Sequence, residues 1–255
     1  MTFCAVLALP GLSLAAADTR FIFEGEQAGA VHHDGSEDLP LRLTDAGFQT
    51  TLPFHARKIR KIGRSWATGT GDVLAIRSAL DALSAAGAED GAAARAHVLD
   101  HVHALLEEAR AAGLPAQRLL ETLLMCARFA QAPATPLPWA FALNEQPGDA
   151  PQAIASPILV NWPLGLANSD HLVQAEDELN DGLTTSAGLP DIVRAFAGAV
   201  HASAQHCNSC SAIAQIGFTA DRGPKGVLSY YVSANAAQLS HCSDAEFDQL
   251  IGAPI

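Results

Sequence analysis

Basic residues are scarce in this chain. It carries 15 Lys and Arg against 27 Asp and Glu in 255 residues, and its formal net charge is −12 at pH 7. Nucleic-acid binding relies on clustered Lys and Arg that neutralise phosphates. The one dense basic run, HARKIRKIGR at 55–64, alternates basic and apolar residues and so predicts a strand rather than a binding arm. We therefore expect no nucleic-acid partner.

Long apolar runs are also missing, and no segment approaches the roughly 18 to 20 uninterrupted apolar residues that would span a bilayer. The opening stretch, MTFCAVLALPGLSLAAADTRF, ends in an AAAD that mimics a signal cleavage site. A secretory signal, however, needs a basic region before its apolar core. Here no Lys or Arg precedes Arg20, and Pro10-Gly11 interrupts the apolar part. We expect no transmembrane helix and a cytoplasmic protein, with export as the less favoured alternative.

Cysteines are few and odd in number, five in all, which does not fit a disulfide framework. Cys207 and Cys210 form a C-x-x-C that, with His201, His241 and Cys242, raises the alternative of a zinc or redox site. There is no second C-x-x-C and no matching histidine spacing. The TGTGD at 68–72 also lacks the Lys of a phosphate-binding loop. We expect no metal and no cofactor.

The first half of the sequence predicts strands followed by helices. FCAVLAL and LSLAAAD are short apolar runs separated by Pro10-Gly11, the pattern of a buried hairpin. A surface loop is expected over 24–40, a second hairpin over 41–54 with Asp-Ala-Gly as its turn, and a half-exposed strand at KIRKI. Apolar spacing then predicts helices over 72–86, 91–112 and 115–130.

The second half returns to strands, around 139–145 and 153–162, and continues with a helix over 190–205. Strands over 211–218 and 226–236, joined by a turn, and a short helix over 244–250 complete the chain. This order predicts a single α+β domain over 1–255 in which two sheets are sandwiched between helices.

The start of the chain also carries a candidate nucleophile. Removal of Met1 would expose Thr2, and an N-terminal threonine can use its own α-amine as the base that activates its hydroxyl. The α-amine has a reference pKa near ~8, so a neighbouring cation would keep more of it neutral and a carboxylate could hold that cation in place. Asp18 and Lys58 supply these groups, and the backbone of TGTGD supplies free N–H groups for an oxyanion.

These residues resemble the start of a proteasome-type β subunit within the N-terminal nucleophile (Ntn) hydrolases, and most of all its bacterial ancestral-β-subunit-like (Anbu-type) branch. That family has a nucleophilic threonine, a strand–turn–strand, and then Asp-Ser/Thr-Arg, matched here by Thr2 and by Asp18, Thr19 and Arg20. A Lys-Ile/Val-x-x-Ile/Leu strand follows in the family. KIRKI matches it and places the catalytic lysine on Lys58 rather than on Lys61.

The resemblance implies further site residues. Gly69 or Gly71 matches the glycine whose N–H faces the oxyanion, and Ser209 matches a serine that lies between a helix and a strand near the C-terminal end. His206 stands where the family has an aspartate that orients the threonine, while Cys210-Ser211 replace two glycines. About two dozen residues over 24–50 are a predicted surface insertion, which loops tolerate.

The resemblance implies a four-layer αββα sandwich and a threonine hydrolase that cleaves amide or peptide bonds through an acyl-enzyme on Thr2. It further implies a ring-shaped homo-oligomer, a peptide or amide substrate and a separate unfoldase, because no nucleotide motif is present in the chain. Two alternatives stay open. One is a small-molecule amidase or acyltransferase on the same fold, and the other is a catalytically silent, ring-forming structural subunit.

Overall fold

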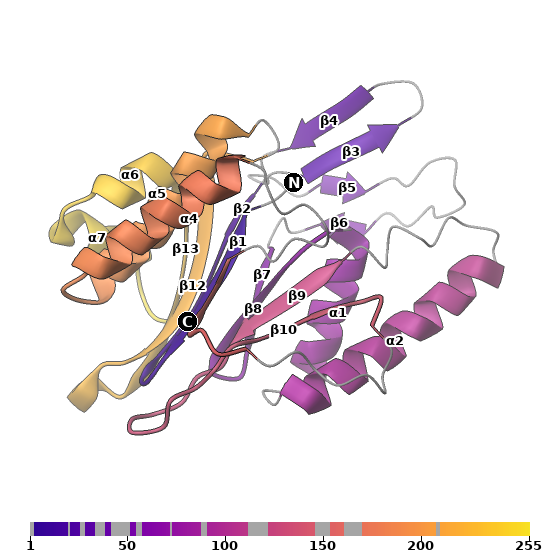
Figure 1. Cartoon of the computed structure of the whole chain (residues 1–255), viewed down its shortest axis with the longest axis horizontal. Helices are drawn as coiled ribbons and strands as arrows, with labels where there is room; N and C mark the ends of the chain where they lie inside the picture. The colour runs from indigo at the N-terminus through magenta and orange to yellow at the C-terminus, as the bar shows by residue number, and fades with distance from the viewer. Residues whose placement is uncertain are drawn as a thin grey trace.

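The computed structural model describes residues 3–19, 21–25, 29–33, 39–41, 52–54, 58–71, 73–87, 91–111, 122–145, 154–160, 170–207 and 210–255. Thr2, Arg20 and Ser209 lie outside these residues. Within them the chain forms two larger antiparallel sheets, two small hairpins and six α-helices (Figure 1). This mixed composition is compatible with the α+β class that the sequence predicts.

The first sheet has five strands in the order β11-β1-β2-β12-β13. Its strands are β1 (Cys4–Leu9), β2 (Leu12–Asp18), β11 (Ile158–Val160), β12 (Ile213–Asp221) and β13 (Val227–Asn235). The predicted hairpin of β1 and β2 is confirmed, with Gly11 at φ 76° in its turn, a conformation that favours glycine. The predicted closing pair is confirmed as β12 and β13, with the short 3-10 helix η1 (Gly223–Lys225) in the turn between them.

The second sheet has four strands in the order β10-β9-β8-β7. They are β7 (Ile59–Ile62), β8 (Ser65–Thr70), β9 (Leu123–Ala127) and β10 (Trp139–Ala142). The helix predicted over 115–130 is wrong where the structure describes that segment, because LLMCA forms β9 between β8 and β10. All five of its residues are buried, and a continuous apolar run of this kind has no period that separates a strand from a helix.

The described part of the chain forms six α-helices: α1 (Val73–Ala86), α2 (Gly91–Ala111), α4 (Asp170–Thr185), α5 (Leu189–His206), α6 (Ala236–His241) and α7 (Asp244–Ile251). The helices predicted for α1, α2, α5 and α7 are confirmed. The sequence patterns did not predict α4 or α6. Figure 1 shows α4 to α7 on one side of the two sheets and α1 and α2 on the other.

Two small hairpins lie in and on either side of the stretch predicted as an insertion. β3 (Phe21–Gly25) pairs with β4 (Gly29–His33), so the surface loop predicted over 24–40 is wrong where β3 ends, where β4 runs and where β5 begins. β5 (Leu39–Leu41) pairs with β6 (Leu52–Phe54), which confirms the strand pairing of the hairpin predicted over 41–54. The Asp-Ala-Gly turn of that hairpin lies outside the described residues.

The apolar core divides into three clusters. One joins the five-stranded sheet to α4–α7, and another joins the four-stranded sheet to α1 and α2. The third takes residues from both sheets, among them Val6, Ala15 and Met125. None of the described helices is long and apolar enough to cross a membrane.

The two sheets approach each other closely at Trp66. Its indole N–H donates a hydrogen bond to Thr219 Oγ1 of β12 at 2.9 Å. A Cβ atom on Gly217 would lie 2.2 Å from the Trp66 ring. The absence of a side chain at Gly217 therefore allows Trp66 of β8 to pack directly against the backbone of β12.

Candidate active site

The register of the first hairpin places Phe3 opposite Asp18. The Phe3 N–H donates to Asp18 Oδ2 at 2.8 Å, and the Asp18 N–H donates to the Phe3 carbonyl at 3.1 Å. The Asp18 carboxylate thus binds the backbone of the residue that directly follows Thr2. Thr2 itself is outside the described residues, so its predicted role as nucleophile stays a prediction.

Asp18 also forms a buried ion pair with Lys58. Lys58 Nζ lies 3.2 Å from Asp18 Oδ1, and the two side chains are 3% and 0% exposed. Buried charges need further hydrogen bonds to offset their desolvation. The backbone on either side of Lys58 is held as well, because its N–H donates to Gln215 Oε1 and its carbonyl accepts from Thr68 Oγ1, each at 2.9 Å. The structure pairs Lys58 with Asp18, whereas Lys61 donates to the Ile255 carbonyl at 3.3 Å.

A third contact to Asp18 comes from Ser211, which the sequence reading noted only as a replacement for glycine. The Ser211 N–H donates to Asp18 Oδ1 at 3.3 Å, and its hydroxyl accepts from the Thr19 N–H at 3.0 Å. Ser211 and Thr19 are both buried. Asp18 therefore receives hydrogen bonds from three segments that lie far apart in the sequence.

The two candidate oxyanion glycines lie at the end of β8. Strand pairing sets Thr68 opposite Ile59, which brings this end of β8 beside Lys58. Gly69 is tightly enclosed: the Cys4 thiol donates to its carbonyl at 3.0 Å, and an added Cβ would lie 2.8 Å from the Leu123 carbonyl. Gly71 is exposed between β8 and α1, with φ 122°. Which of the two faces an oxyanion stays a prediction.

The remaining predicted site residues lie near the end of α5. His206 is the last residue of that helix and its side chain is exposed. Ser209 lies outside the described residues. The supporting roles predicted for both stay predictions.

Two cysteine thiols lie close to the ion pair. Burial raises the pKa of Cys4 to about 12, against a partial lowering by the Lys58 charge. Burial, followed by the negative charge of Asp18, raises the pKa of Cys210 to about 12. Cys207 is half-buried, by contrast. Both raised pKa values favour the neutral thiol at any pH near neutrality.

We therefore expect unequal thiol reactivity in the folded protein. Iodoacetamide at pH 8 should alkylate Cys207 well before Cys4 and Cys210, because the thiolate is the reactive form and is scarce when the pKa is near 12. Peptide mass mapping over time measures the order, with the urea-unfolded protein as the control in which all cysteines react. Alkylation of Cys4 in the folded state at the Cys207 rate would contradict this expectation.

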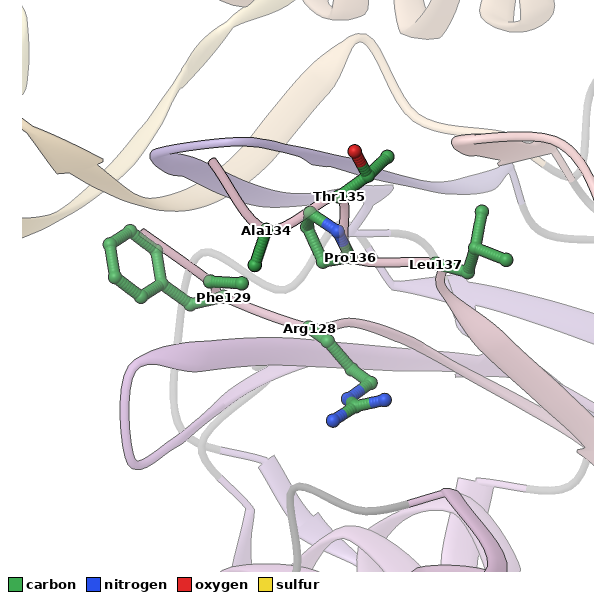
Figure 2. A pocket seen from close by; sticks show the side chains of 7 residues that line it. Arg128, Phe129, Ala134, Thr135, Pro136 and Leu137 are labelled. Carbon is green, nitrogen blue, oxygen red and sulfur yellow. The ribbon is translucent and has the colours of Figure 1, made fainter. Parts of the chain in front are cut away.

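One pocket of the described residues lies beside the β1–β2 turn. It has a volume of about 260 Å³ and is lined by residues that include Arg128, Phe129, Pro136 and Leu137 (Figure 2). Its wall residue Ala130 accepts a hydrogen bond from the Gly11 N–H in the β1–β2 turn. That turn is at the opposite end of β2 from Asp18, so this pocket is separate from the candidate site. Among the described residues, no three His, Cys, Asp or Glu side chains gather to hold a metal ion.

The described architecture is that of a mixed α/β protein with two antiparallel sheets and flanking helices, and comparison with solved structures finds a protein of the same fold. A mutant of Anbu from Hyphomicrobium sp. strain MC1 superposes with a TM-score of 0.52 at 12% sequence identity. The superposition covers 98% of this chain and 95% of the Anbu chain. No family model and no curated protein matches the sequence. The likeness to Anbu supports the resemblance of the N-terminal motifs at the level of the fold.

Proposed function

We propose that this chain is a threonine Ntn hydrolase that cleaves amide or peptide bonds, built as a four-layer αββα sandwich. The observation that carries the proposal is the buried pair of Asp18 and Lys58, set against the backbone of Phe3. A buried lysine, paired with the carboxylate that binds the residue after a candidate N-terminal threonine, suits the activation of an α-amine base.

The proposed reaction has two stages. Thr2 Oγ attacks the substrate carbonyl carbon while its proton passes to the Thr2 α-amine, and the N–H of Gly71 or Gly69 stabilises the oxyanion. The C–N bond then breaks, the leaving amine takes the proton, and an ester to Thr2 remains. Water hydrolyses this ester and restores the hydroxyl. Lys58 lowers the proton affinity of the amine, and Asp18 holds Lys58 in position.

Other parts of the proposal follow from the resemblance. Ser209 and His206 support the Thr2 amine, and the single domain carries an insertion over 24–50. The active form is a cytoplasmic, ring-shaped homo-oligomer that acts on peptides delivered by a separate unfoldase. Light scattering that detects only monomers at working concentration would contradict the ring.

The test of this function is the intact mass of the purified protein before and after reaction with a peptide epoxyketone, an electrophile for N-terminal threonine. We expect loss of Met1 and a single adduct on the wild type. Thr2→Ala should abolish the adduct, because it removes the attacking oxygen and keeps the amine. Ser13→Ala is the matched control. Ser13 lies at the end of β2 opposite to Asp18, and its buried hydroxyl donates to the Ala127 carbonyl, so the Ser13→Ala variant should still form the adduct.

The outcomes separate the alternatives. A single adduct together with turnover of simple amides, and none of peptides, would assign the small-molecule amidase or acyltransferase instead. Retained Met1 with no adduct would contradict the nucleophile and favour the structural subunit. A mature chain that begins at Asp18 would show that the opening stretch is a signal, and Thr2 would then have no catalytic role.

A further inference from the structure

Ser211 occupies a position where the resemblance implies a glycine, and its hydroxyl forms hydrogen bonds that a glycine could not form. We propose that Ser211 is a positioning residue that fixes the corner formed by Asp18 and Thr19. This inference rests on the proposed function of the site.

The backbone of Ser211 contacts the same carboxylate oxygen as the lysine. Its N–H donates to Asp18 Oδ1 at 3.3 Å, and Lys58 Nζ lies 3.2 Å from that atom. Asp18 and Ser211 are both fully buried, so no water competes for these contacts. A glycine at this position would supply the same backbone N–H to Asp18.

The hydroxyl adds what a glycine lacks. It accepts from the Thr19 N–H at 3.0 Å and from the Ile213 N–H at 3.2 Å, which uses both of its acceptor positions. Its single hydrogen is left for Thr19 Oγ1 at 2.7 Å or the Ile213 carbonyl at 3.1 Å. The hydroxyl thus ties the residue after Asp18 to the start of β12, across 192 positions of sequence.

This tie controls the direction of the carboxylate. β12 pairs with β2 so that Ala214 lies opposite Asp18, and the Ser211 hydroxyl, three residues before Ala214, binds Thr19 just beyond that pair. Without the hydroxyl, the buried Thr19 N–H loses an acceptor, and the corner must rearrange to find another. Any rearrangement at Thr19 moves the adjacent Asp18, and with it the position of Lys58 relative to Phe3.

The experiment is inactivation kinetics with the peptide epoxyketone, which separates the reaction step, kinact, from reversible binding, KI. Ser211→Ala should lower kinact by about tenfold or more with KI unchanged, because misplaced groups slow the chemical step. Ser211→Thr keeps the hydroxyl and should recover kinact to within about threefold of the wild type. Ser13→Ala is the control, a fully buried serine on β2 about 17 Å from Asp18 along the strand, and its kinact should not change.

Each outcome either supports or contradicts the inference. If the wild type forms no adduct, the proposed function fails and this inference fails with it. If the wild type reacts and Ser211→Ala behaves like Ser13→Ala, only the role of Ser211 is overturned. If Ser211→Ala does not fold, Ser211→Cys fills the same space with a weaker hydrogen-bond acceptor for the Thr19 N–H. We expect kinact of Ser211→Cys to fall several-fold, and an unchanged kinact would overturn the inference.

Discussion

Lys58→Ala is expected to slow epoxyketone labelling of Thr2 by about 100- to 1,000-fold, the effect of losing one preorganised charge from a catalytic site. It should also lower the free energy of unfolding by about 3 to 5 kcal/mol, because it leaves the Asp18 carboxylate buried without its cation. Labelling rates and urea unfolding at pH 7 measure the two effects on the same preparations.

Two further variants separate the loss of activity from the loss of stability. Lys58→Met combined with Asp18→Asn removes both charges, so it should recover much of the stability and none of the labelling. Lys61→Ala removes the nearby lysine that contacts the Ile255 carbonyl, and it should leave the labelling rate unchanged. If the double variant labelled at the wild-type rate, the ion pair would have no part in the chemistry.

Gly217→Ala is expected to destabilise the fold by about 3 kcal/mol, the upper end of the usual effect of overpacking. The new methyl group would lie 2.2 Å from the Trp66 ring, and Trp66 is held by its hydrogen bond to Thr219. Relief of the clash requires the ring to move or the two strands to separate. Urea unfolding gives the loss of stability, and tryptophan fluorescence reports the displacement of the ring.

The control for this substitution is Gly188→Ala, where the added Cβ meets Pro190 Cδ at an ordinary 3.8 Å and φ is −174°. It should change stability little. Trp66→Phe introduced together with Gly217→Ala shortens the ring system and should restore part of the lost stability. Equal stability of Gly217→Ala and the wild type would show that the sheets do not depend on this close contact.

The sequence predicted the elements whose turn residues and apolar spacing lie within one short segment of the chain. Pro10-Gly11 between two apolar runs was sufficient for the β1–β2 hairpin, and helical spacing was sufficient for α1, α2, α5 and α7. β9 was misread as helix because its five buried apolar residues lie between two strands, so neither face shows a polar residue that would reveal the period.

The candidate site was predictable only in its charged members. Asp18 and Lys58 stand in a recognisable local context, and the structure brings them to 3.2 Å. Ser211 and Gln215 could not be predicted from the sequence, because their contacts to Thr19 and Lys58 span 192 and 157 positions and depend on the pairing of β12 with β2. A serine and a glutamine carry no pattern that reveals such partners.

The enclosure of Cys4 gives the molecule an internal spectroscopic reporter. Its thiol donates to the Gly69 carbonyl, lies 3.5 Å from Thr68 Oγ1, and is within the electrostatic influence of both Lys58 and Asp18. The S–H stretching vibration falls in an infrared window where amide groups absorb little, and its frequency follows the local electric field. Since the pKa of this thiol is about 12, the proton and its band persist across the working pH range. Infrared difference spectra can therefore follow the field of the ion pair during the proposed acylation without any added label.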